Sequence, residues 1–123
     1  MYRLLCPNEN TINAYLSLCS DLPLSYSDVG STLTNTMPSG WLVNHNDVGL
    51  GYGDDVWHFA KSSIAAFAMF KMNWVDLVPS NAKMIKGEIV ATMARIVGVW
   101  TLNPCRIVDV VDEKNRYGFA YGT

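Results

Sequence analysis

The sequence has few charged residues, and its basic residues are too scattered to form a nucleic-acid surface. Only 16% of the 123 residues are charged, and the formal net charge is −2 with a pI near 5.5. Proteins that bind nucleic acid need clustered lysine and arginine to neutralise phosphates, whereas the nine basic residues here form no run. Because half of the residues are apolar, the composition predicts one globular domain, or part of one, with no nucleic-acid partner.

Long hydrophobic runs are also missing. No window approaches the ~18 consecutive apolar residues of a membrane span. The most apolar run, residues 63–70, lies between Lys61 and Lys71, which indicates a buried helix. The N-terminal "LLC" is followed at once by "PNE", so it is not the core of a signal peptide. We therefore expect neither a membrane span nor a signal peptide.

Cysteine is scarce, and its spacing excludes a disulfide framework. Cys6, Cys19 and Cys105 are odd in number and widely separated, and they form no C-x-x-C motif. Reduced, partly buried thiols are typical of cytosolic proteins. The sequence therefore predicts a cytoplasmic location.

The familiar phosphate-binding motifs are absent. "GLGYGDD" is glycine-rich and precedes an expected helix, but its spacing is G-x-G-x-G rather than G-x-G-x-x-G. Asp54 and Asp55 would place negative charge where a phosphate would sit. A structural turn is the better interpretation.

The polar residues likewise give no catalytic or metal-ligating pattern. His45 and Asp47 share one face of an expected strand, and His58 lies one turn into a helix, a spacing that matches no familiar metal motif. Asp112 and Glu113 are adjacent, so on a strand they point to opposite faces and fail as a catalytic pair. We therefore predict no metal and no cofactor, and the catalytic residues, if the protein is an enzyme, stay unknown.

Two helices are expected in the first part of the chain. Residues 8–22 carry an apolar stripe at helical spacing after a possible cap at Asn8 or Asn10, and Pro23 ends the helix. Residues 25–40 form a turn-rich linker, and residues 41–51 resemble a strand. A second, long helix is predicted over residues 54–72. Its stripe, which should face a sheet, consists of Trp57, Ala60, Ile64, Phe67 and Ala68.

After the second helix the apolar period changes to two, which is typical of strands. Strands are predicted over residues 74–78, 86–99 and 106–111, with turns at "PSN" and at Asn103-Pro104, and "DEKN" forms a hairpin loop. The last eight residues, "RYGFAYGT", alternate large and small side chains and form a closing strand. A run of strands after a helix favours an α+β fold with an antiparallel sheet.

The aromatic residues are the main candidates for a ligand site. On the sequence alone a plain core and an apolar pocket between a sheet and a long helix are equally well supported. The lining candidates are Phe67, Trp74, Trp100, Tyr117, Phe119 and Tyr121.

The segment "NPCRIVDVVDEKNRYGFAYGT" (residues 103–123) resembles the signature of a domain-of-unknown-function family of bacteria and plants. "LSYSDVGST" (residues 24–32), "GLGYG" and "FAMFKMNW" (residues 67–74) are similar to it as well. Asp109 departs from the pattern, which has an apolar or aromatic residue there. In the family the motif continues into Leu-Pro-Gly-His-Pro-Glu and Gly-Glu-Glu.

The resemblance implies a helix-grip fold similar to START and birch-pollen-allergen-like domains, in which a curved antiparallel sheet wraps a long helix. The chain then divides into an N-terminal helix over residues 1–23 and a region over residues 24–123, which the resemblance identifies as a partial START-like domain, about the N-terminal two thirds of the whole. The His and Glu that the family pattern places beyond the threonine are the polar site residues it would lack.

Three functions follow as hypotheses. The first is the binding of a small hydrophobic molecule in a cavity between sheet and helix. The second is an enzyme on the same scaffold, such as a cyclase or hydrolase, which is less favoured because no acid–base pair is evident. The third is a homo-oligomer or other assembly through the open strand edge at residues 117–123.

Overall fold

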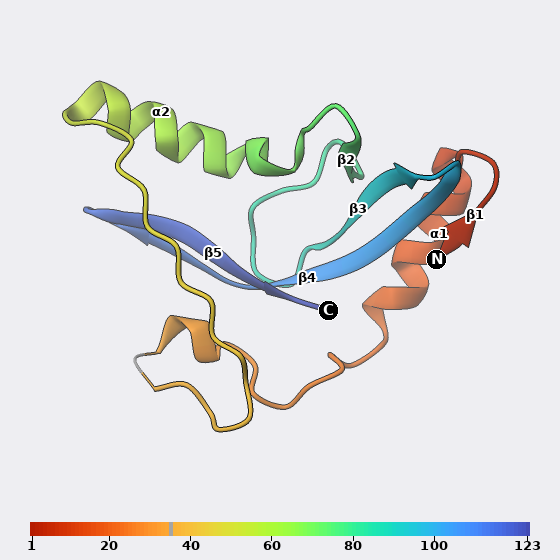
Figure 1. Ribbon diagram of the computed structural model, residues 1–123, viewed down its shortest axis with the longest axis horizontal. Coiled ribbons are helices and arrows are strands. Elements are labelled where there is room, and N and C mark those ends of the chain that lie inside the picture. Colours follow the sequence, from red (N-terminus) through yellow and green to blue (C-terminus); the bar gives the residue numbers. More distant parts are fainter. Residues whose placement is uncertain (35) are drawn as a thin grey trace.

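The computed structural model describes residues 1–34 and 36–123, and it shows an α+β chain built on an open antiparallel sheet (Figure 1). The described residues form two helices, α1 (Glu9–Ser20) and α2 (Asp54–Ala65). The strands are β1 (Tyr2–Arg3), β2 (Val75–Val78), β3 (Ile89–Ile96), β4 (Val99–Glu113) and β5 (Arg116–Gly122). The predicted α+β class and antiparallel sheet are therefore confirmed.

The long strand β4 organises the sheet. The strand order is β1-β4-β3-β2, and β5 also pairs with β4. One edge of β4 pairs with β3, while the other edge pairs with β1 at Trp100 and Thr101 and with β5 from Arg106 to Glu113. Every other strand is thus placed directly or indirectly by β4, which curves across the molecule (Figure 1).

The predicted turn at Asn103-Pro104 is wrong, because both residues lie within β4 and pair with β3. The N–H of Leu102 donates to the Met1 carbonyl at 2.9 Å, so the nitrogen of Pro104, two residues on, points toward the same edge. That edge has no paired strand between β1 and β5. Proline is tolerated there because no ladder hydrogen bond is lost.

The hairpin turn lies instead at Val97 and Gly98, inside the strand predicted over residues 86–99. Val97 has φ 49° and Gly98 has φ 81°, and two successive positive φ angles are what a tight hairpin turn requires. Valine rarely adopts such a φ, so this turn has little signal in the sequence. The second hairpin, at Lys114 and Asn115, lies within the predicted loop.

The first helix is confirmed. Asn8 caps α1, and its Oδ1 accepts a hydrogen bond from the Thr11 N–H at 2.9 Å. Ile12 and Leu16 are buried against the sheet. These two residues are part of the predicted apolar stripe.

The second helix is shorter than predicted, because α2 ends at Ala65 rather than Met72. Phe67 has a left-handed φ of 55° and is only 2% exposed. The left-handed conformation costs about 1–2 kcal/mol, which burial of a phenylalanine side chain, about 1.5–3 kcal/mol, offsets. The helix therefore stops where the chain turns Phe67 into the core.

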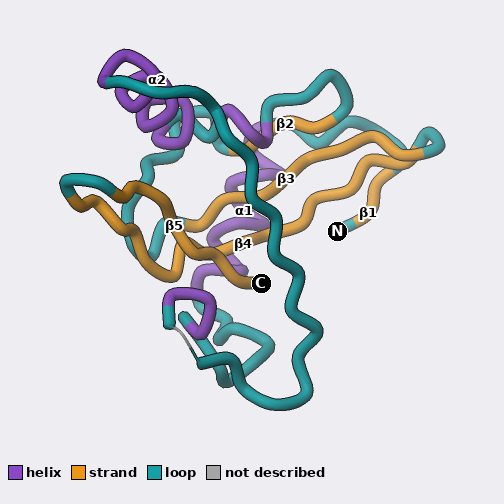
Figure 2. The backbone as a smooth tube through the Cα atoms, turned by 60° about the vertical axis from the view of Figure 1, so that its left-hand side comes forward, coloured by secondary structure: helices purple, strands orange, loops and turns teal. Residues whose placement is uncertain are grey.

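The strand predicted over residues 41–51 is wrong as well. These residues are exposed and take part in no sheet pairing. They belong to the long connection from α1 to α2, which passes the end of β5 (Figure 2). An apolar pattern is not sufficient for a strand, because its backbone also needs an adjacent edge with which to pair. His45 and Asp47 thus lie in an exposed loop.

The sheet has a buried cluster on each side. On the α1 face, Ile12 and Leu16 pack against Ala91 and Leu102. The opposite face, which we call the α2 face, holds a second cluster of buried residues, Phe67, Leu77, Val90 and Ile107. The neighbours Val90 and Ala91 point to opposite faces, as a β-strand requires.

Phe67 provides a test of this core. Replacing Phe67 with Ala removes a buried ring, and we expect the free energy of unfolding to fall by about 3–5 kcal/mol. Phe59→Ala is the control, because Phe59 is 76% exposed on α2 and its loss should change stability by less than about 0.5 kcal/mol. Urea denaturation followed by circular dichroism measures both. Equal effects of the two substitutions would contradict the assigned core.

Candidate functional site

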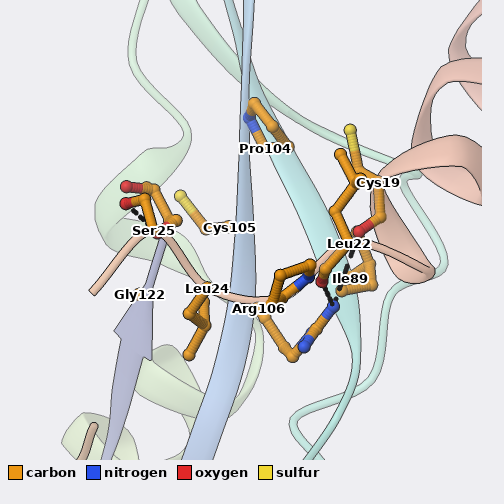
Figure 3. Close-up of a pocket in the computed structure, with 11 residues that line it drawn as sticks. Cys19, Leu22, Leu24, Ser25, Ile89, Pro104, Cys105, Arg106 and Gly122 are labelled. Atoms are coloured by element: carbon orange, nitrogen blue, oxygen red, sulfur yellow. Dashed lines mark hydrogen bonds between the residues drawn. The ribbon is translucent and has the colours of Figure 1, made fainter. Parts of the chain in front are cut away.

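A cleft lies on the α1 face, between the chain that leaves α1 and the adjoining ends of β4 and β5. It consists of two neighbouring pockets that share Ser25, Gly122 and Thr123. The inner pocket, of about 230 Å³, is shown in Figure 3. The outer pocket is larger, at about 490 Å³. Together they form a concave site against the sheet.

The inner pocket begins where Arg106 of β4 binds the C-terminal end of α1 (Figure 3). Its Nη2 donates to the carbonyl oxygens of Cys19, Ser20 and Leu22 at 3.4, 3.0 and 2.7 Å. The last turn of α1 has no basic residue of its own, so Arg106 supplies the positive charge that a helix C-terminus favours. The guanidinium thereby fixes the start of the loop onto the sheet.

A second contact joins the loop to the end of β5. Both the backbone N–H and the hydroxyl of Ser25 donate to the Thr123 carbonyl, at 3.2 and 2.9 Å. Ser25 and Thr123 are 98 residues apart in the sequence. This contact lies between the inner and outer pockets, since both residues border each of them.

The outer pocket is walled by aromatic side chains and backbone. The rings of Tyr26 and Trp41 meet edge to face with centroids 5.6 Å apart. Trp41 Nε1 donates to Asp28 Oδ2 at 3.0 Å. Tyr26 also packs against Gly122, where an added Cβ would lie 2.9 Å from Tyr26 Cζ and closer still to its hydroxyl oxygen. The close approach of Tyr26 to the sheet therefore depends on glycine at position 122.

The complete outer lining combines apolar and small polar residues: Ser25, Tyr26, Asp28, Gly30, Ser31, Thr32, Met37, Pro38, Trp41, Val108, Ala120, Tyr121, Gly122 and Thr123. Ligand sites in proteins are commonly concave, mostly apolar and of this size, with a few polar groups that orient the ligand.

Two cysteines border the inner pocket, Cys19 from α1 and Cys105 from β4, and the Cys105 side chain packs against the cluster on the α2 face. Burial raises the pKa of the Cys105 thiol, so at neutral pH it is protonated and a weak nucleophile. The pKa of Tyr15 is raised by burial and, to a smaller extent, by Cys19. Among the described residues no group of three His, Cys, Asp or Glu side chains is placed to hold a metal ion.

The six aromatic residues predicted from the sequence lie in different places. Tyr121 borders the outer pocket. Phe67, Phe119 and Tyr121 pack together on the α2 face with Phe70, which the sequence interpretation missed, at centroid distances between 5.8 and 6.5 Å. The alternation of β5 thus gives Phe119 and Tyr121 one common face.

The remaining three predicted residues lie outside this cluster. Tyr117 lies under the Lys61 Nζ of α2, which is 4.9 Å from the ring centroid and also pairs with Asp112 at 2.6 Å. Trp74 is 59% exposed just before β2. Trp100 lies at the N-terminal end of β4, where its backbone is in register with Arg3 of β1 and Arg95 of β3.

The sequence interpretation missed Tyr26, Asp28, Trp41 and Arg106 as site residues. Tyr26 and Asp28 lie in "LSYSDVGST", which carried part of the family resemblance but was assigned to a linker. Arg106 lies in "NPCR", which also carried part of the family resemblance but was not interpreted as part of a site. The signal was present, but nothing local in the sequence indicates that these two segments meet.

A different concavity runs along α2. It is an apolar groove of about 570 Å³ lined by Leu50 and by residues of α2 and the turn after it, including Val56, Phe59 and Ile64. Its walls come from that one part of the chain, and no sheet residue borders it. Asp109, the departure from the family pattern, lies elsewhere, at a bulge in β4, where it accepts from the Val110 N–H at 3.0 Å.

The fold and site define an α+β domain with an open antiparallel sheet and an apolar cleft at one end of it. Residues 25–123 match the family model described as a domain of unknown function, DUF1990. The chain belongs to this family, as the resemblance predicted. The matched region begins and ends at Ser25 and Thr123, the two residues that hydrogen-bond across the cleft.

Two curated relatives are named UPF0548 protein. The one from Deinococcus radiodurans is 29% identical over 135 aligned positions, which cover 100% of this chain and 67% of that protein. The one from Dictyostelium discoideum is 24% identical over 131 positions, covering 95% of this chain and 61% of that protein. The chain therefore spans about two thirds of the length of these relatives. No solved structure matches the sequence.

In the described part of the chain, no helix combines the length and apolar character needed to cross a membrane.

Arg106 provides the test of how the cleft is held. Arg106→Met keeps the aliphatic stem but removes the charge, and we expect it to lower the free energy of unfolding by about 1.5–3 kcal/mol, the usual contribution of hydrogen bonds to a charged group. The control is Arg95→Met, because Arg95 is exposed on β3. Urea denaturation gives the stabilities, and hydrogen exchange should show faster exchange at residues 19–25 in the Arg106 variant alone. Unchanged exchange there would contradict the role of Arg106.

Proposed function

We propose that this protein binds a small, predominantly apolar molecule in the cleft. The observation that carries the proposal is the outer pocket of about 490 Å³, in which the rings of Tyr26 and Trp41 adjoin a floor of small residues from β5. Two segments far apart in the sequence, residues 25–32 and 120–123, supply most of its lining. The hydrogen bonds of Ser25 to Thr123 hold these segments together, and Arg106 holds the chain just before them to β4.

We also propose that residues 24–123 belong to a START-like, helix-grip domain. The curved antiparallel sheet with helices beside it supports this proposal (Figure 1). The greater length of the relatives also fits it, since 67% and 61% of their lengths are matched. We also propose a cytoplasmic location. It is supported by three free cysteines, Cys6, Cys19 and Cys105.

The aromatic residues chosen from the sequence stay predictions as ligand-lining residues. Tyr121 is the one that borders the cleft. Phe67 and Phe119 line the α2 face, and Tyr117 lies near α2 beside them. Trp74 and Trp100 lie apart from both. A ligand in the cleft would therefore contact the rings of Tyr26 and Trp41 first.

We propose binding rather than catalysis. Among the described residues that border the cleft, Asp28 is the one carboxylate side chain, and no histidine borders it. General acid–base catalysis needs a positioned group of suitable pKa within hydrogen-bond reach of the substrate. His45 and Asp47, the pair considered from the sequence, are exposed in the loop between α1 and α2.

The binding proposal is tested with a neutral apolar dye, N-phenyl-1-naphthylamine, whose fluorescence rises on leaving water. The Gly122→Ala variant places a methyl group against the Tyr26 ring, and we expect at least a tenfold loss of dye affinity, corresponding to about 1.4 kcal/mol. Gly118→Ala is the matched control in the same strand, because a Cβ there meets nothing within 4 Å. It should bind the dye as the unchanged protein does.

A second measurement separates the two faces of the sheet. The Trp41→Leu variant alters the cleft, whereas Phe119→Ala alters the α2 face. Loss of dye binding in the Phe119 variant alone, with full binding in the Trp41 and Gly122 variants, would place the site on the α2 face. No dye binding by the folded protein would contradict the proposed function.

A second candidate role is self-association through β5. In the described chain β5 pairs only with β4, so its outer edge presents unpaired backbone groups that can pair with another strand. Tyr121 on this strand is 49% exposed. A homo-oligomer formed through this edge is the partner proposal that follows.

Sedimentation velocity across a range of concentrations tests this role. We expect self-association of the unchanged chain, and dissociation toward monomer when Gly118→Lys introduces a charge on β5, because charged residues oppose edge-to-edge pairing. Gly118→Ala is again the control. A chain that stays folded and monomeric at every concentration would contradict the proposal.

A further inference from the structure

The charges of the chain are unevenly distributed along the sequence. No lysine or arginine occurs at residues 4–60, although the same stretch contains six carboxylates: Glu9, Asp21, Asp28, Asp47, Asp54 and Asp55. The remaining residues, 61–123, contain eight of the nine basic residues. The loop side of the cleft comes from this stretch, so it brings carboxylates and no lysine or arginine of its own, and negatively charged surfaces attract cations.

Asp28 brings one of these charges into the outer pocket. It is the one charged side chain among the lining residues there. Its Oδ2 accepts the Trp41 Nε1 hydrogen bond at 3.0 Å, and among the described residues its Oδ1 accepts no hydrogen bond. The Trp41 contact fixes the direction of the carboxylate while leaving one oxygen for a ligand.

Two aromatic rings, those of Tyr26 and Trp41, adjoin the same space. Tyr26 and Trp41 meet edge to face at 5.6 Å, and Tyr121 borders the pocket from β5. The faces of aromatic rings carry partial negative charge and bind ammonium groups, tryptophan best of the three types. The Asp28 carboxylate and the aromatic rings therefore both favour a positively charged group on a ligand.

The nearest basic residues do not supply an opposing charge to this pocket. Arg106 borders the inner pocket and is not part of the outer lining, and its Nη2 donates to carbonyls at and just after the end of α1. Lys61 pairs with Asp112, and Lys86 lies 4.0 Å from Asp109. An anionic ligand would meet Asp28 without a compensating cation among the described lining residues.

We propose that the outer pocket selects an organic cation: a protonated amine or quaternary ammonium group carried on an apolar body. The cationic head lies against Trp41 and Tyr26 with Asp28 as its counter-charge, and the apolar body extends toward Val108, Ala120 and Gly122. This proposal rests on the proposed function and specifies its ligand class.

The test compares two molecules of the same shape. Choline carries a quaternary nitrogen, and 3,3-dimethylbutan-1-ol replaces that nitrogen with carbon. Isothermal titration of the full chain at low ionic strength measures both affinities. We expect choline to bind about tenfold or more tightly than the alcohol, in line with the strength of cation–aromatic and ion-pair contacts in partly desolvated sites, and added salt should reduce the difference.

Matched variants assign the selectivity. Asp28→Asn removes the charge and retains an oxygen for the Trp41 hydrogen bond, so the preference for choline should fall severalfold. Asp47→Asn makes the same change of charge on the exposed loop outside the lining, and the preference should persist. Circular dichroism confirms that each variant is folded.

Each other outcome is decisive. If the alcohol binds as tightly as choline, or if neither binds while the neutral dye does, the cation selectivity is overturned and apolar binding stands. If the preference for choline falls equally in the Asp28 and Asp47 variants, the role of Asp28 is overturned. If neither molecule nor the dye binds, this inference and the proposed function fail together.

Discussion

The cleft exists because one arginine connects a helix terminus to the centre of the sheet. Arg106 lies where β4 begins to pair with β5, and its guanidinium reaches three carbonyls at the end of α1. Without that contact the chain after α1 would have no polar anchor until Ser25 meets Thr123. Both contacts join residues more than 80 positions apart, so the entropy of ordering the loop is opposed by a few charge-assisted bonds rather than by a buried core.

The two faces of the sheet have different roles, and a bulge in β4 separates them. The register shifts between Ile107 and Asp109. Ile107 and Val110 therefore both reach the cluster around Phe67, although a regular strand would send residues three apart to opposite faces. Val108 is left to border the outer pocket. One extra residue thus keeps the α2 face packed and at the same time gives the cleft an apolar wall.

The sequence predicted those parts of the fold that depend on neighbouring residues. The cap at Asn8, the stripe of Ile12 and Leu16 and the alternation of β5 are local patterns, and each was confirmed. The errors arose where distant partners decide the structure. Pro104 continues a strand because the facing edge is unpaired, and Phe67 ends a helix because its ring is needed in the core. The site depended most on such partners, since neither Arg106 nor Tyr26 has a sequence neighbour that reveals what it contacts.

The closing strand shows how one short pattern serves both faces. In "RYGFAYGT" the large residues Phe119 and Tyr121 point toward the α2 face, where they pack with Phe70. The small residues between them, Ala120 and Gly122, point toward the cleft and border the outer pocket. Tyr26 can approach the strand only because Gly122 has no side chain. The aromatic residues drew attention to this strand from the sequence, but the small residues provide the space that a ligand would occupy, and the rings around that space come from the loop.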